Sequence, residues 1–251
     1  MARKFGQHFL KRQSVLERIA VAACGERAPL AIEIGPGRGA LTTHLLAHAD
    51  RVVAIEIDPI LVQYLRTKFR GEERLEIVEG DILKVDLAQW GAASVAGNLP
   101  YYITSPIVEK VLGLGALLAR AVFLVQKEVA DRLTAAPGSR DYGYLTVATQ
   151  FQADMEYLLT VPPAAFHPPP KVDSAVVRLT PRAVPAAVDA AAFLHFASLA
   201  FQHKRKNLRN NLAAEYDRSV LDALPEGRLR AEQLGLDGLM ALFTRLRSPA
   251  P

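Results

Sequence analysis

The chain has 251 residues, 50% of them hydrophobic and 22% charged, which is enough to bury a core and to form one full domain plus a smaller one. Thirty basic and 26 acidic side chains leave a formal charge of +4, which favours a polyanionic partner. The single cysteine, Cys24, excludes an internal disulfide framework, and no window approaches the roughly 18 to 20 apolar residues of a membrane span, so we expect a soluble cytoplasmic protein.

The first two thirds of the chain predict strands that alternate with helices. We expect helices at about 14–24, 39–47, 59–69, 105–112, 127–134 and 144–151, and strands at 30–34, 52–57, 75–78, 94–97 and 121–125. Two late strands, at about 154–160 and 173–179, would close the sheet. This alternation predicts an α/β fold with a parallel, doubly wound sheet.

A proline-rich stretch separates the two late strands. Residues 161–171 contain too many prolines for a helix or a central strand, so we expect an ordered loop or a stiff arm. The composition shifts again at 181–185, and the spacing of apolar residues is helical from about 188 onward. We therefore expect two domains, at 1–180 and 181–251, of which the second is small and helical.

Three consecutive strand ends carry groups that suit a nucleotide. The first strand runs into Gly35-Pro36-Gly37-Arg38-Gly39, and glycines allow a ligand to approach the backbone closely. Near the end of the second strand, Glu56 could accept both hydroxyl hydrogens of a ribose, and Asp81 after the third could receive an adenine amino group. The G-x-G-x-G spacing differs from the dinucleotide G-x-G-x-x-G. Taken singly, the glycines could form ordinary tight turns, Glu56 could be a solvated strand end and Asp81 a turn former.

The segment Val95-Ala96-Gly97-Asn98-Leu99-Pro100-Tyr101-Tyr102 ends a strand with an amide, a rigid turn and a ring. The Asn98 side-chain oxygen and the Leu99 carbonyl can each accept a hydrogen from an amino group. Pro100 fixes φ so that this carbonyl stays aimed, and Tyr101 offers a face for stacking. The set predicts chemistry on adenine N6. The other interpretation is a strand and a proline turn in which Asn98 caps and Tyr101 packs.

A set of motifs resembles the KsgA/RsmA family of ribosomal RNA adenine dimethyltransferases over roughly residues 3–212. In chain order they are Gln7-His8-Phe9-Leu10, Glu33-Ile34-Gly35-Pro36-Gly37, Ile55-Glu56-Ile57-Asp58, Gly80-Asp81, Asn98-Leu99-Pro100-Tyr101, Gln126-Lys127-Glu128-Val129 and Pro168-Pro169-Pro170-Lys171-Val172-Asp173-Ser174. The resemblance implies a Rossmann-like methyltransferase with a small helical C-terminal domain and S-adenosylmethionine as cofactor. The residues that it assigns to the cofactor site are Gln7, His8, Leu10, Gly35, Gly37, Glu56, Ile57, Asp81, Ile82 and Asn98. His8 stands where many relatives carry Asn, and because His can also be charged, it could change the pH response of cofactor binding.

The same resemblance implies a substrate and a set of catalytic residues. The substrate is a pair of adjacent adenines in the 3′-terminal hairpin loop of 16S ribosomal RNA in the 30S particle. Each adenine receives two methyl groups, which contributes to small-subunit biogenesis, and we expect a monomer that needs neither a metal nor a membrane. The expected catalytic residues are Asn98, Leu99, Pro100, Tyr101 and Phe166. Asn98 and Leu99 would hold the amine, while Tyr101 and Phe166 would contact the unstacked base. A ring packed under its own proline loop is the other interpretation of Phe166.

Basic residues form the expected RNA-binding surface. They are Arg3, Lys4, Lys11, Arg12, Arg132, Arg140, Lys204, Arg205, Lys206 and Arg209. Segment 201–210 has no acid and predicts the phosphate-binding start of a helix, with a solvated helix face as the alternative. His44 and His48 have the i, i+4 spacing of a metal pair, but no third ligand is suggested nearby, so we expect no metal site.

Three other functions are compatible with parts of the sequence. A resistance methyltransferase that acts on an adenine of large-subunit RNA shares the cofactor motifs and the Asn98 segment, but the proline-rich stretch and the Gln126-Lys127-Glu128 run favour the small subunit. A non-catalytic assembly factor that binds immature 30S particles would not require an intact Asn98-Leu99-Pro100-Tyr101. An NAD-dependent dehydrogenase is disfavoured by the glycine spacing.

Overall fold

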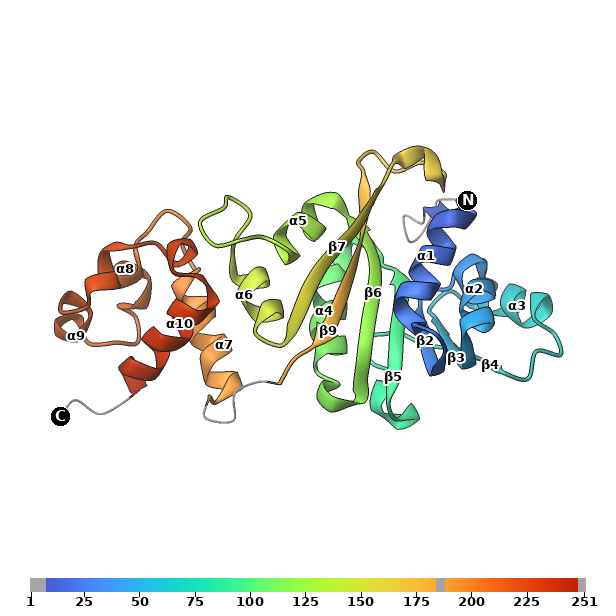
Figure 1. Ribbon diagram of the computed structural model, residues 1–251, viewed down its shortest axis with the longest axis horizontal. Helices are drawn as coiled ribbons and strands as arrows, with labels where there is room; N and C mark the ends of the chain where they lie inside the picture. The colour runs from blue at the N-terminus through green and yellow to red at the C-terminus, as the bar shows by residue number, and fades with distance from the viewer. Residues whose placement is uncertain (1–7, 184–187, 248–251) are drawn as a thin grey trace. The chain divides into compact units, whose positions relative to one another are not determined.

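The structure is a computed structural model that describes residues 8–183 and 188–247. The chain forms two compact units, of which unit 1 contains Met1–Ala130 and Ala153–Pro181 and unit 2 contains Asp131–Gln152 and Arg182–Pro251 (Figure 1). The sequence placed Asp131–Gln152 in the first domain, whereas the structure groups this segment with the second. The reason is that Tyr142, Val147 and Phe151 are buried in the core of unit 2.

Unit 1 is built on a seven-stranded sheet with the order β4-β3-β2-β5-β6-β9-β7. The strands are β2 (Ala28–Ile34), β3 (Ala49–Glu56), β4 (Leu75–Glu79), β5 (Ala93–Asn98), β6 (Leu118–Gln126), β7 (Ala153–Val161) and β9 (Ser174–Pro181). The strands from β4 to β6 pair in parallel, as the alternation predicted. The late strand β9 pairs antiparallel with both β6 and β7, so the sheet is mixed rather than wholly parallel.

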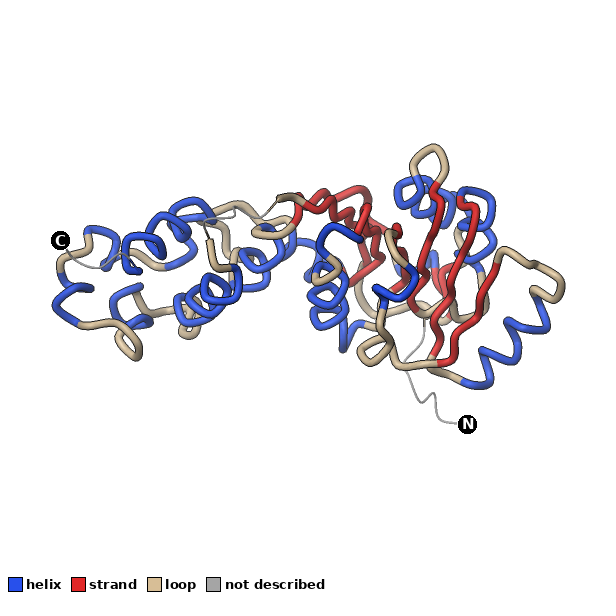
Figure 2. The backbone as a smooth tube through the Cα atoms, turned by 90° about the horizontal axis from the view of Figure 1, so that it is seen from below, coloured by secondary structure: helices blue, strands red, loops and turns tan. Residues whose placement is uncertain are grey.

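The direction of the connections determines which face of the sheet each helix covers. Helices α2 (Ala40–His48) and α3 (Pro59–Lys68) carry the chain from β2 to β4 in one direction, and α4 (Thr104–Leu112) carries it from β5 to β6 in the other. Right-handed crossovers therefore place α4 on the opposite face from α2 and α3, and Figure 2 shows helices on both sides of the strands. The strand order reverses between β2 and β5, which is where open α/β sheets form a ligand crevice.

One face of the sheet is covered by α1 (Gln13–Cys24) and α2, which pack against each other. Their apolar side chains form one buried core with alternate residues of adjacent strands, namely Ala31, Val52, Ala96, Val122 and Val176. Because strand side chains alternate between the two faces, this register fixes which residues of β2 and β5 reach the crevice at the strand ends.

A second, two-stranded sheet joins the N-terminal segment to residues 162–173, which we call the proline arm. Strand β1 (Phe9–Leu10) pairs antiparallel with β8 (Phe166–His167). The Lys11 amide donates to the Ala165 carbonyl at 2.9 Å and extends this pairing. The proline arm is therefore ordered, as predicted, but its strand was not foreseen.

Unit 2 is helical, as predicted for its part after residue 181. Its helices are α6 (Tyr144–Gln150), α7 (Ala190–Ala200), α8 (Leu208–Leu212), α9 (Arg218–Asp222) and α10 (Ala231–Arg247), and α5 (Lys127–Leu133) leads into it from β6. Phe193 lies at the centre of its core, with ring centroids 4.6 Å from Phe151 and 5.6 Å from Phe243. Across the described ranges, no helix is long and apolar enough to cross a membrane.

Gly97 allows β5 to approach β2 closely just before the segment that contains Asn98. A Cβ atom at Gly97 would lie 2.6 Å from the Ile34 carbonyl oxygen, a backbone atom that cannot rotate away. We expect Gly97→Ala to push the two strands apart and to lower the free energy of unfolding by roughly 1–3 kcal/mol. Urea denaturation followed by circular dichroism measures this change.

Gly143→Ala is the matched control, because a Cβ atom there meets nothing within 4 Å and its φ of −161° is ordinary extended backbone. Equal denaturation midpoints for the two variants would show that β2 and β5 do not depend on a glycine at this contact.

Candidate active site

A cavity of about 480 Å³ opens at the carboxyl ends of β2, β3 and β5, where the strand order reverses. Residues from the turn after β4 and from the N-terminal segment complete its wall. Most of the predicted site residues line it, namely His8, Leu10, Gly35, Gly37, Glu56, Ile57, Asp81, Ile82, Asn98, Leu99, Pro100 and Tyr101. The structure thus brings these twelve predicted cofactor and catalytic residues together in one cavity.

The glycine turn after β2 is shaped by close contacts that exclude side chains. Gly35, Gly37 and Gly39 have φ values of 67°, 58° and 71°, in the left-handed region. A Cβ atom would lie 2.9 Å from the Phe9 ring if built on Gly37 and 2.5 Å from the Phe69 ring if built on Gly39. The turn therefore stays free of side chains at these positions, and the rings of Phe9 and of Phe69, which follows the last residue of α3, pack against it.

Glu56 ends β3 and fixes the glycine turn. Its buried carboxylate accepts hydrogen bonds from the amides of Gly37 at 3.0 Å, Ile57 at 2.9 Å and Asp58 at 3.0 Å. Burial raises the pKa of Glu56, and the three amide donors oppose that rise. A carboxylate has about four lone-pair sites, so this one retains acceptor capacity toward the cavity.

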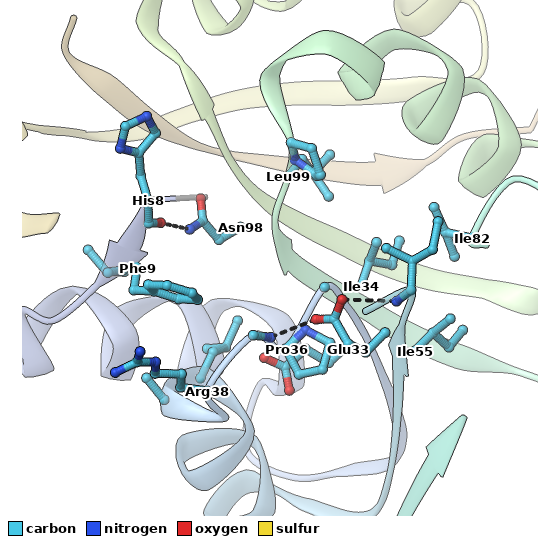
Figure 3. A pocket seen from close by; sticks show the side chains of 18 of the residues that line it. His8, Phe9, Glu33, Ile34, Pro36, Arg38, Ile55, Ile82, Asn98 and Leu99 are labelled. Atoms are coloured by element: carbon cyan, nitrogen blue, oxygen red, sulfur yellow. Dashed lines mark hydrogen bonds between the residues drawn. The ribbon is translucent and has the colours of Figure 1, made fainter. Parts of the chain in front are cut away.

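Asn98 is oriented by a bond to the N-terminal segment. Its side-chain nitrogen donates to the His8 carbonyl oxygen at 2.9 Å, as Figure 3 shows. Because the nitrogen is engaged there, the side-chain oxygen is the atom left to accept hydrogens from a ligand. The Leu99 amide donates to the Leu124 carbonyl of β6 at 3.0 Å, which anchors the next residue to the sheet.

Tyr101 stands beside Asn98 in the turn that precedes α4. Its phenol oxygen lies 2.9 Å from the Ser174 hydroxyl, and burial raises the pKa of the phenol. The His8 ring is stacked with the Tyr101 ring, with centroids 6.0 Å apart and planes inclined by 25°. Asn98 and Tyr101 are therefore both held by residues far away in the sequence.

Sequence reasoning missed several residues that line the cavity. Among them are Phe9, Glu33, Arg38 and Tyr102. The Arg38 guanidinium lies 5.2 Å from the centroid of the Phe9 ring, and the two side chains form one wall. Nothing in the sequence marked Phe9 as a cavity residue beyond its place in the N-terminal motif. Glu33 could have been recognised, because it is a lone acid inside the apolar strand Leu30-Ala31-Ile32-Glu33-Ile34.

Two predicted site residues fall outside this cavity or outside the described part of the chain. Phe166, predicted to contact the target base, is 4% exposed and packs in the core of unit 1, because the pairing of β8 with β1 turns its ring inward. The burial of Phe166 agrees with the alternative raised from the sequence, a ring that packs under its own proline loop. Gln7 lies outside the described residues.

The predicted RNA-binding residues have different environments. Lys11 and Arg12 are exposed beside β1, and Arg132 and Arg140 are exposed in unit 2, while Arg3 and Lys4 lie outside the described ranges. The exposed residues Lys204, Arg205 and Lys206 lie in the turn before α8 rather than at a helix start, because α8 begins only at Leu208. Arg209 forms an ion pair with Asp222 at 2.8 Å, so its charge is already balanced within unit 2.

His44 and His48 have a structural partner. Both rings lie against the carboxylate of Glu17 in α1, His44 Nδ1 at 2.6 Å and His48 Nε2 at 2.7 Å. These bonds lower the pKa of Glu17, with His44 as the largest cause. The i, i+4 pair thus joins α2 to α1.

The reversed strand order, the glycine turn and the amide and carbonyl beside a stacking ring define a Rossmann-like methyltransferase that acts on an amine of a flat base. Residues 1–234 match the family model described as ribosomal RNA adenine dimethylase. The chain belongs to this family, and it is a ribosomal RNA adenine dimethyltransferase.

Relatives and solved structures agree with this assignment. The chain is 45% identical to the ribosomal RNA small subunit methyltransferase A of Synechococcus sp. (strain JA-2-3B'a(2-13)), over 99% of this chain and 94% of that protein. It is 42% identical to the protein of the same name from Acidobacterium capsulatum, over 97% and 90%. A dimethyladenosine transferase from Plasmodium falciparum matches with a TM-score of 0.82 and 27% identity, over 95% and 98% of the two chains. The 23S rRNA methyltransferase ErmE matches with a TM-score of 0.76 and 30% identity, over 96% and 100%.

Proposed function

We propose that this enzyme transfers methyl groups from S-adenosylmethionine to N6 of two adjacent adenines in the 3′-terminal hairpin loop of 16S ribosomal RNA. The substrate is the 30S particle, each adenine receives two methyl groups, and the modification contributes to small-subunit biogenesis in the cytoplasm, with the enzyme acting as a monomer. The observation that carries the proposal is the orientation of the Asn98 side chain. Its nitrogen donates to the His8 carbonyl, so its oxygen is the atom that can accept a hydrogen bond from an amine.

The residues of the cavity fit S-adenosylmethionine. The cofactor carries a positively charged sulfonium and an ammonium group, and Glu56 and Asp81 place carboxyl groups in the wall. Glu56 retains about one lone-pair site for a ribose hydroxyl, and Ile57 and Ile82 offer apolar surface to an adenine ring. When bound, the cofactor supplies an electrophilic methyl group and leaves as a neutral thioether.

The segment from Asn98 to Tyr101 holds the substrate amine. The lone pair of adenine N6 is delocalised into the ring, so the amine is a weak nucleophile until it is positioned in line with the methyl group. In the first transfer the Asn98 oxygen and the Leu99 carbonyl accept hydrogen bonds from the two N–H groups of the amine, and in the second transfer one N–H remains for them. Pro100 keeps the Leu99 carbonyl aimed with a φ of −62°. These two acceptors favour a more tetrahedral nitrogen and stabilise the positive charge that develops on it.

The basic residues of the turn before α8 bind RNA phosphates. Lys204, Arg205 and Lys206 are exposed, and counterion release makes such contacts dependent on salt. If all three are replaced by glutamine, we expect the slope of log affinity against log salt concentration to become shallower by about two to three. Binding of 30S particles measured between low and physiological salt gives this slope.

Arg51→Gln is the control for this triple variant. Arg51 is an exposed arginine of unit 1 that forms an ion pair with Glu76 at 2.5 Å, so its replacement should leave the slope unchanged. A triple variant with the slope of the wild type would remove this turn from the RNA-binding surface.

The likeness to ErmE supports a second candidate, methylation of an adenine in 23S RNA. The relatives named small subunit methyltransferase A have higher sequence identity, which favours the small subunit. The deciding experiment measures transfer of labelled methyl groups to 30S particles that lack the modification, with 50S particles in parallel, and identifies the labelled nucleoside.

Dimethyladenosine on 30S particles alone is the expected result. Label on 50S particles would select the second candidate. Binding to 30S particles without label would leave an assembly factor that does not catalyse methyl transfer.

A further inference from the structure

The phenol oxygen of Tyr101 is hydrogen-bonded to a residue of β9, the strand that lies between β6 and β7. Its partner Ser174 is the first residue of β9 and is 0% exposed. Ser174 pairs with Gln126 of β6 on one side and with Val161 of β7 on the other, so two ladders hold its backbone. The bond of 2.9 Å between the two hydroxyls therefore ties a side chain of the cavity wall to a fixed point.

In addition to the bond at its phenol oxygen, Tyr101 has a stacking contact on one face of its ring. The His8 ring stacks on it, and His8 Nδ1 lies 2.9 Å from the Pro168 carbonyl oxygen. A carbonyl only accepts, so Nδ1 is the nitrogen that carries the hydrogen, and this bond fixes the plane of the imidazole. Ser174 and Pro168 thus hold Tyr101 from two sides, one directly and one through His8.

We infer that Ser174 is a positioning residue for the methyl transfer: through the hydroxyl bond it fixes the Tyr101 ring in the orientation in which the target adenine stacks. This inference rests on the proposed function, because it takes Tyr101 as the stacking surface. A phenylalanine ring would offer the same area, but it could rock about its side-chain bonds. The hydroxyl removes that freedom, and small errors in the placement of a reacting group reduce the rate strongly.

The test compares Ser174→Ala, Tyr101→Phe and the double variant in labelled methyl transfer to unmodified 30S particles. Each single change removes the same bond, so we expect each to lower kcat by roughly three- to tenfold, the range of one neutral hydrogen bond. The double variant should be no slower than the singles, because residues that act through one shared bond are not additive. The dissociation constant for S-adenosylmethionine, measured by calorimetry, should change by less than about twofold.

The chain offers a matched control in β7. Tyr157 and Thr160 form the same kind of phenol–hydroxyl bond, at 2.7 Å, in an exposed position. Tyr157→Phe should leave kcat unchanged, which separates the loss of this particular bond from the loss of any tyrosine hydroxyl.

Two results would overturn the inference. One is a Tyr101→Phe variant with the kcat of the wild type, which is informative even if Ser174→Ala folds poorly. The other is a double variant whose defect is the product of the two single defects. If instead the wild-type enzyme forms no dimethyladenosine on 30S particles, the proposed function itself fails, and this outcome is seen before any variant is compared.

Discussion

Asn98→Ala is expected to raise the activation free energy of methyl transfer by roughly 2–4 kcal/mol, the range measured when one preorganised polar group is removed from a site of developing charge. The variant loses the oxygen that accepts from adenine N6, whereas Glu56, the glycine turn and the carboxyl groups of the cavity stay in place. S-adenosylmethionine affinity should therefore change little. Single-turnover methyl transfer and calorimetric binding of the cofactor measure the two quantities separately.

Asn98→Asp separates the two functions of the Asn98 amide, which are to accept from the substrate amine through its oxygen and to orient the side chain through its nitrogen. It keeps an acceptor oxygen but loses the nitrogen that donates to the His8 carbonyl, so the side chain is no longer oriented. We expect a turnover number between those of the wild type and the alanine variant. An alanine variant that turns over as fast as the wild type would remove Asn98 from the mechanism.

Glu33→Gln is expected to become more stable than the wild type as the pH rises. Glu33 is buried in β2, and burial raises the pKa of its carboxyl group from 4.5 to about 8, a rise that the bond from Thr42 at 2.5 Å opposes. Between these pH values the folded protein binds a proton that the unfolded chain has lost. The contribution of Glu33 to stability is therefore fully present below pH 4.5 and is lost as the pH rises toward about 8.

The expected size of this effect follows from the size of the pKa change. At about 1.36 kcal/mol per pKa unit, the wild type should lose on the order of 4–5 kcal/mol relative to Glu33→Gln between acid and mildly alkaline pH. Glutamine keeps an acceptor for Thr42 but does not ionise. Urea denaturation of both proteins at several pH values measures the difference.

Glu79→Gln, at the exposed end of β4, is the control and should show no comparable divergence. Parallel stability profiles for the wild type and Glu33→Gln would mean that Glu33 is already ionised, or solvated, in the folded protein.

The regular elements of unit 1 could be predicted because their signals are local. Apolar runs such as Val52-Val53-Ala54-Ile55, bounded by polar residues and turns, mark buried strands, and the parallel part of the sheet follows from their alternation with helices. The antiparallel pairing of β9 with β6 and β7 depends on contacts between distant segments, for which a single sequence has no periodic signal.

The same distinction separates the parts of the active site. The glycine turn, Glu56, Asp81 and Asn98 could be read from strand ends, because parallel strands present these ends at one edge of the sheet. Strands β1 and β8 contain two residues each, which is too short for any periodic pattern, so the contact of the N-terminal segment with the proline arm could not be seen. For this reason the sequence alone did not decide between a Phe166 that contacts the target base and one that packs in the core, where the structure places it. The membership of 131–152 in unit 2 was missed because its partners lie at 188 and beyond.

The pairing of β1 with β8 has a consequence for synthesis on the ribosome. Residues 8–10 emerge before the rest of the described unit 1, but the carbonyl that holds His8 belongs to Pro168, 160 positions later in the chain. At translation rates of about 5–20 residues per second, the N-terminal strand waits on the order of 10–30 seconds for its partner. A nascent chain can form the strands from β2 to β6 during that time, but its cofactor cavity still lacks one wall. The enzyme therefore completes its site only after nearly all of unit 1 has been made, and a translation product that stops before Pro168 lacks the carbonyl that holds His8 in the cavity wall.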